Sequence, residues 1–149
     1  MRILSIDIET KDPYLKSHGT GAMFEDSKIL TICAYDGVKD YQNITPEETQ
    51  ELINNSDFVI GANVQYDLSF LAFKHGITVP ESTTISDVLV NERLLDTLTA
   101  RINLEALCNK YLNTSKHTDD IAVYAEKHKI KKYIENLDKI PLDMVIMYC

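Results

Sequence analysis

The chain has 149 residues, of which 44% are apolar and 26% charged, so it is long enough for one domain with a proper core. No apolar run approaches the length that spans a bilayer, and the opening "MRILSIDIET" lacks the pattern of a signal peptide. The formal net charge of −8 counts against binding nucleic acid by charge alone, although carboxylates that hold cations also contribute to it.

The segments predicted to be strands come mainly in the first half. They are residues 2–9, 28–35, 38–43, 58–62 and the short "TTIS" at 83–86. "DGVKD" at 36–40 contains an Asp-Gly turn signal, which predicts a hairpin between the second and third strands.

The helices follow from caps and apolar spacing. Thr45, Pro46 and Glu48 form the pattern of a capping box, and Gly76 is the expected stop of a helix over 66–76. Later helical segments are predicted at 87–96, 103–113, 119–129, 131–139 and 141–149, with "HTDD" at 117–120 as a cap. This order predicts a single α/β domain over residues 1–149, with a central mixed β-sheet, flanking helices and a helical C-terminal half.

The cysteines and the lysine cluster indicate little about function by themselves. Cys33, Cys108 and Cys149 are far apart, odd in number and lack a CxxC pair, so neither a disulfide framework nor a zinc knuckle is expected. A reducing, cytosolic compartment fits this usage. The basic cluster "KHKIKK" at 127–132 is interpreted as a solvated helix face.

Asp7 and Glu9 stand at alternate positions of the apolar first strand, so their side chains share a face. Two like charges that close repel each other and resist desolvation, which calls for a positive partner. Asp67 follows another strand at the opening of a helix, where the helix dipole alone also explains an acid. A cluster of hard oxygen ligands suits Mg²⁺ or Mn²⁺.

"SIDIET" and "NVQYDLSFL" resemble the first and second motifs of the DEDD family of 3′–5′ exonucleases. The resemblance is closest to the proofreading domain of phage-type family A DNA polymerases. "DIETKDPYLKSHGTG", "SDVLVNERLLD" and "NLEALCNKYL" are similar to further segments of those enzymes, so the likeness runs from Ser5 to the end of the chain.

This resemblance implies a ribonuclease H-like (DnaQ-like) fold and phosphodiester hydrolysis with two Mg²⁺ or Mn²⁺ ions. By the same likeness Asp7 bridges the two ions, Glu9 holds the ion that activates water, and Asp67 serves the second ion. Thr10 and Asn63 would contact the terminal nucleotide or its phosphate. Lys11 and Lys16 are either phosphate contacts or ordinary surface residues.

The third motif of the tyrosine subgroup is Tyr-x-x-x-Asp, and Tyr148 would be its tyrosine, orienting the attacking water. An ordinary core aromatic is the alternative for Tyr148. The matching acid would lie at the fourth position after Tyr148, past Cys149. Asp143 lies on the wrong side of the pattern, and neither His117 nor His128 offers the histidine variant. The chain is therefore interpreted as an exonuclease domain cut within its third motif, or as a short protein lacking the fourth ligand, with weak or absent hydrolysis.

Three functions remain open at this point. The first is a proofreading 3′–5′ exonuclease acting on the 3′ end of single-stranded DNA, with a polymerase domain in the parent chain, in a bacterial or phage-infected cytosol and without a membrane. The second is a free-standing exoribonuclease of the same superfamily. The third is a nucleic-acid-binding scaffold without turnover, which the missing acid favours.

Overall fold

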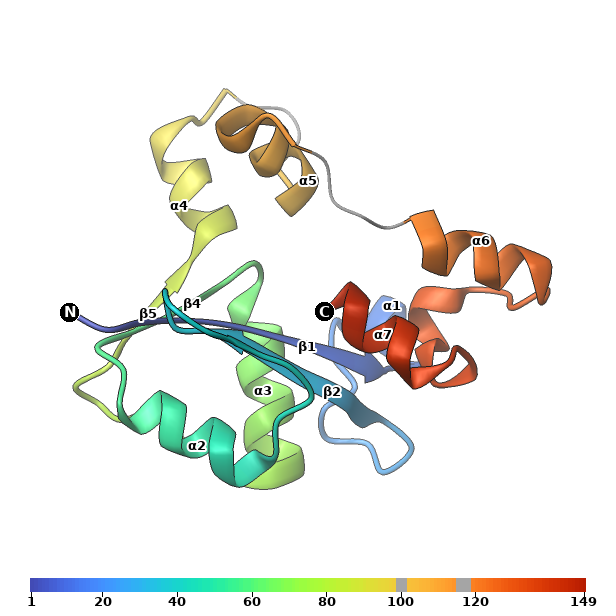
Figure 1. Cartoon of the computed structure of the whole chain (residues 1–149), viewed down its shortest axis with the longest axis horizontal. Coiled ribbons are helices and arrows are strands. Elements are labelled where there is room, and N and C mark those ends of the chain that lie inside the picture. The colour runs from blue at the N-terminus through green and yellow to red at the C-terminus, as the bar shows by residue number, and fades with distance from the viewer. Residues whose placement is uncertain (99–101, 115–118) are drawn as a thin grey trace.

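The computed structural model describes residues 1–98, 102–114 and 119–149, and these form a five-stranded mixed sheet with helices around it (Figure 1). The strand order is β3-β2-β1-β4-β5; β2 is antiparallel to β1 and β3, whereas β4 is parallel to β1 and β5. The strands are β1 (Ile3–Lys11), β2 (Lys28–Tyr35), β3 (Asp40–Tyr41), β4 (Phe58–Gly61) and β5 (Thr84–Asp87). The five predicted strands are thus confirmed.

The two faces of β1 have different partners. Leu4, Ile6 and Ile8 are buried in the main core, which also contains residues of α2 (Pro46–Asn54) and α3 (Val64–His75). Ser5, Asp7 and Glu9 alternate with them and therefore project from the opposite face. The period of two thus directs the acids of β1 away from the apolar core.

Local signals set the ends of α2 and α3 as expected. The Thr45 hydroxyl accepts from the Glu48 amide, and the Glu48 carboxylate accepts from the Thr45 amide, which confirms the capping box. Gly76 ends α3 with a left-handed φ of 67°. Phe70 of α3 is buried in the main core, and Leu68 packs against it.

The second half is helical but more broken than the sequence predicts. It contains α4 (Val88–Leu95), α5 (Leu104–Leu107) continued by a π-helix (Cys108–Leu112), α6 (Asp119–Lys127) and α7 (Leu142–Tyr148). A second core joins α6 and α7 through Ile121, Leu137, Ile140 and Val145. α7 lies against β2, on the side of the sheet away from α2 and α3 (Figure 1).

Three expectations are wrong in detail. The segment 131–139 is not one helix but two 3₁₀ turns, Tyr133–Glu135 and Leu137–Lys139, because Lys132 adopts a left-handed φ of 50°. The basic cluster at 127–132 therefore lies at the end of α6 and in the following loop, not on a helix face. The third strand is only two residues long, because the Asp36 carboxylate accepts from the Val38 and Lys39 amides and keeps them in the turn.

A short helix, α1 (Leu15–His18), was not expected from the sequence, and its C-cap Gly19 has a left-handed φ of 76°. The expected cap at 117–120 begins outside the described residues, since His117 and Thr118 are not described. Within the described ranges, no helix combines the length and apolar character that a bilayer crossing requires.

Candidate metal and nucleotide site

Asp7 and Glu9 lie on the central strand β1, with side chains on one face. One carboxylate oxygen of each, together with the Cys149 sulfur, forms a group in which all three atoms are within 4.8 Å of one another. Glu9 is only 9% exposed. The pairing of β1 with β2 is irregular between Glu9 and Thr10, so a β-bulge lies directly at the second acid.

Asp67 is brought to these acids by the way β4 ends. The parallel pairing of β1 with β4 stops at Ser5 and Ile60, so the rest of β1 extends beyond β4. A sharp turn through Asn63, whose φ is 61°, then starts α3 beside that free part of β1. Gly61 permits this close approach, since a Cβ there would lie 3.1 Å from the Ile6 carbonyl oxygen.

Asp67 lies within electrostatic reach of the other two acids. Its side chain is 4% exposed, and burial, followed by the negative charges of Asp7 and Glu9, raises its pKa from 3.8 to about 9. Asp67 therefore retains its proton at neutral pH unless a cation compensates the acids. The sequence predicts that Asp7, Glu9 and Asp67 act together, and the structure places them within electrostatic reach of one another.

Asp87, at the end of β5, is a fourth acid near this site that the sequence analysis did not single out. One of its oxygens accepts from the Leu89 amide at 2.8 Å and caps α4, while the other accepts from the Val64 amide at 3.1 Å at the start of α3. Its charge also contributes to the raised pKa of Asp67. The Asp immediately before the helical segment "VLVNERLL" was the available signal, since Asp is a preferred N-cap residue.

A cavity of about 180 Å³ lies next to Glu9 and collects the residues expected to contact a nucleotide. Glu9, Thr10, Asn63 and Tyr66 line it, with an apolar remainder formed by Ile8, Leu15, Ile134 and Leu137. Thr10 and Asn63, which are distant in sequence, therefore face one space together with a candidate metal ligand. Its mixed polar and apolar lining is typical of small ligand sites.

Tyr66 is fixed at the wall of this cavity by a buried network. Its hydroxyl lies 2.7 Å from the Thr10 hydroxyl and donates to the Asp12 carboxylate at 3.0 Å. Asp12, 1% exposed, also accepts from the amides of Gly21 and Tyr14. Burial raises the pKa of Tyr66, so its hydroxyl remains a hydrogen-bond donor.

The predicted lysine contacts form ion pairs in the structure. The Lys11 ammonium lies 3.6 Å from the Asp138 carboxylate, and Lys16 lies 3.1 Å from Glu135. A phosphate that binds Lys11 would therefore compete with Asp138 for the Lys11 ammonium.

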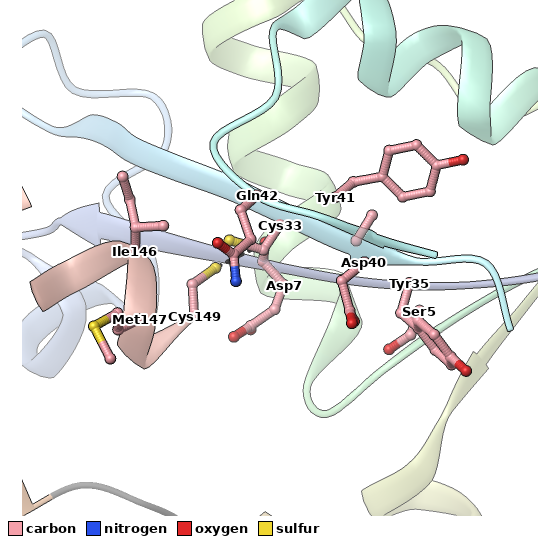
Figure 2. Close-up of a pocket in the computed structure, with 11 residues that line it drawn as sticks. Ser5, Asp7, Cys33, Tyr35, Asp40, Tyr41, Gln42, Ile146, Met147 and Cys149 are labelled. Atoms are coloured by element: carbon pink, nitrogen blue, oxygen red, sulfur yellow. Dashed lines mark hydrogen bonds between the residues drawn. The ribbon is translucent and has the colours of Figure 1, made fainter. Parts of the chain in front are cut away.

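Tyr148 and Cys149 lie at the end of α7 and face different spaces. Tyr148 packs with the second core and lines a cavity of about 110 Å³ together with Ile121 and Met144. Cys149 lines a different cavity, of about 340 Å³, with Asp7 and Cys33 (Figure 2). The proximity of Cys149 to Asp7 and Glu9 could not be predicted from the sequence, because β1 and the end of α7 meet only in the folded chain.

The donor set fits a divalent cation. Asp7 and Glu9 offer hard oxygen ligands within 4.8 Å of each other, and the raised pKa of Asp67 indicates that negative charge is concentrated at this buried place. Cys149 adds a softer sulfur to the same group.

Comparisons with known proteins bear on the fold. Neither the family models nor the curated proteins that were searched match the sequence. Solved structures that resemble the chain include Brucella melitensis NrnC bound to pGG (TM-score 0.56, 21% identity, 76% of this chain and 53% of that one). The apo form of a nuclease (TM-score 0.57, 17% identity) gives the same two coverages. NrnC with bound Mg²⁺ (TM-score 0.58, 18% identity) is matched over 95% of this chain and 72% of its own.

These likenesses and the mixed strand order confirm a ribonuclease H-like α/β fold. The chain spans about half the length of the first two solved structures that it matches.

Proposed function

We propose that the chain is a metal-dependent 3′–5′ exonuclease domain that hydrolyses phosphodiester bonds at the 3′ end of a single strand. The observation that carries this proposal is the pair of carboxylate oxygens of Asp7 and Glu9 within 4.8 Å of each other, with the buried Asp67 close enough for their charges to raise its pKa. The nuclease structures that share the fold, one of them with bound Mg²⁺, support it.

In this proposal Asp7 and Glu9 would hold divalent cations, and Asp67, as a carboxylate, would be the third ligand. Two such ions, when bound, stabilise the charge that develops on the attacking and leaving oxygens of the phosphodiester. Metal binding is expected to release the proton of Asp67, because this proton and a cation compensate the same negative charge. The fixed strand β1 keeps Asp7 and Glu9 in register, which limits the reorganisation needed on binding.

The terminal nucleotide is proposed to occupy the cavity beside Glu9. Thr10 and Asn63 would supply polar contacts there, and the apolar remainder of the wall would contact the base or sugar. Tyr66 orients Thr10 through their hydrogen bond, so it positions one of these contacts. Lys11, at the end of β1, would meet the phosphate backbone in competition with Asp138.

Two classes of substrate are proposed, single-stranded DNA and short RNA. Single-stranded DNA follows from the sequence resemblance to proofreading domains, as does the proposed attachment to a phage-type polymerase. Short RNA is the second candidate, because NrnC, whose fold this chain shares, is bound to pGG.

The role of Tyr148 is proposed on the sequence motif alone. α7 would need a further turn to present an acid at the fourth position after Tyr148. We therefore expect weak turnover by the 149-residue chain and stronger turnover by a chain extended to include that acid.

The test is turnover of 5′-labelled single-stranded DNA and RNA oligonucleotides, and of pGG, with Mg²⁺ or Mn²⁺, by this chain and an extended one. Stepwise shortening from the 3′ end that is lost in Asp7→Asn and kept in Glu51→Gln, an exposed acid on α2, would support the proposal. Metal titration by calorimetry on the same variants reports binding separately from turnover. Strand binding without metal and without cleavage, by both chains, would refute it in favour of the scaffold alternative.

A further inference from the structure

Two cysteines from distant parts of the chain meet above one residue of the central strand. Cys33 on β2 is the direct antiparallel partner of Asp7 on β1, and such partners present their side chains on the same face of a sheet. Cys149, at the end of α7, donates from its sulfur to the Asp7 carbonyl oxygen at 3.5 Å. Both sulfur-bearing side chains therefore lie over Asp7.

The two thiols are in contact with each other. The two side chains are close enough for hydrogen bonding between their thiols, and Figure 2 shows the two sulfur atoms side by side between β2 and α7. Cys33 is 8% exposed, whereas Cys149 is partly exposed, and both line the cavity of about 340 Å³. A small oxidant that enters this cavity reaches both sulfurs.

We propose that Cys33 and Cys149 are a redox modification site, which hydrogen peroxide converts into an intramolecular disulfide between β2 and the end of α7. One of the two sulfurs takes one oxygen as the O–O bond breaks, giving a sulfenic acid and one water. The other sulfur then attacks this oxidised sulfur, the S–O bond breaks, and a second water carries away the hydroxyl with the remaining thiol proton. Each sulfur gives up one electron, and the peroxide accepts both.

The two cysteines of this cross-link are neighbours in space but far apart along the chain. The sulfurs are already neighbours, and we expect the partly exposed end of α7 to move toward β2 so that they reach a bond length of about 2.0 Å. The link would close a loop through most of the chain, which restricts the unfolded ensemble strongly. The oxidised form should therefore unfold at a higher temperature than the reduced form. The inference does not depend on the proposed function.

The experiment uses the whole 149-residue chain, fully reduced and then exposed to hydrogen peroxide. Free thiols are blocked by alkylation, and the protein is digested and analysed by mass spectrometry without reductant. We expect a peptide pair joined between Cys33 and Cys149, lacking two hydrogens and separated again by dithiothreitol, with Cys108 alkylated. The midpoint of thermal unfolding should rise by about 5 °C or more on oxidation and return on reduction.

Three variants make the test specific. Cys108→Ser is the matched control and should keep both the cross-link and the shift in midpoint, while Cys33→Ser and Cys149→Ser should lose both. Circular dichroism shows whether each variant is folded; Cys149→Ser, at a partly exposed position, is decisive if the buried Cys33→Ser unfolds. Sulfinic acid on Cys149 without a cross-link, pairing through Cys108, or disulfides only between chains would overturn the proposal.

Discussion

Replacing Asp67 with Asn should stabilise the metal-free protein, and by an amount that grows with pH. Asp67 is buried among Asp7, Glu9 and Asp87, which keeps its folded pKa at about 9 against an ordinary value of 3.8. Below 3.8 both the folded and unfolded states hold the proton. Between the two values only the folded state holds it, so raising the pH lowers the free energy of unfolding.

The magnitude follows from the pKa shift. Each pH unit inside that window removes about 1.4 kcal/mol, and neutral pH lies about three units above the unfolded value, so the upper bound is about 4 kcal/mol. Relaxation and water entry reduce it, and we expect Asp67→Asn to gain about 2 to 4 kcal/mol at neutral pH. Near pH 4 the variant and the wild type should be almost equally stable.

The assay is urea unfolding in the presence of a chelator, at about pH 4, 6 and 8, for the wild type, Asp67→Asn and Glu51→Gln. Adding Mg²⁺ should then stabilise the wild type more than Asp67→Asn, because only the wild type offers the carboxylate. Equal unfolding free energies of the wild type and Asp67→Asn at every pH in chelator would refute the reasoning, since Asp67 would then carry no buried proton.

Other perturbations test the surrounding structure. Tyr66→Phe removes the donor to Asp12 and should cost about 1 to 3 kcal/mol in urea unfolding, while Tyr35→Phe at an exposed position should not. Asp87→Ala removes hydrogen bonds that cap both α3 and α4 and should lower the free energy of unfolding by about 1 to 2 kcal/mol. The same variant should lower the pKa of Asp67, measured by NMR titration, because it removes a nearby negative charge. Asp143→Ala is the control and should leave that pKa unchanged. Hydrogen bonds from Lys110 and Tyr111 lower the pKa of the buried Glu92 from 4.5, so the stability that it adds is present above 4.5 and lost as the pH falls. The difference in thermal midpoint between wild type and Glu92→Gln should accordingly narrow on acidification, and a constant difference would contradict this.

The sequence predicted those parts of the fold that local chemistry decides. The capping box at Thr45, the stop at Gly76 and the alternation on β1 each act within a few residues, and each is found as expected. The broken segment after α6 was missed because its backbone is set by tertiary packing. Its apolar residues, among them Leu137, turn inward to the second core, and no period-3.6 pattern records that.

In the candidate site, too, some residues could be predicted from the sequence and others could not. Asp7, Glu9 and Asp67 were identified by motif, and the structure explains their approach through the early end of β4. Cys149 and Asp87 were missed as neighbours of these acids, because only the folded chain brings α7 and β5 to them. Pairwise contacts across so many residues leave no trace in a single sequence.

The hydrogen bond from the Cys149 sulfur to Asp7 joins residues 142 positions apart. During synthesis β1 leaves the ribosome long before α7 does, so the Asp7 side of the central strand stays in contact with water until α7 has been made. This side of β1 is therefore covered only after all five strands of the described sheet have been synthesised. Anything that delays docking of α7 would prolong the time for which nascent β1 stays open to solvent on that side.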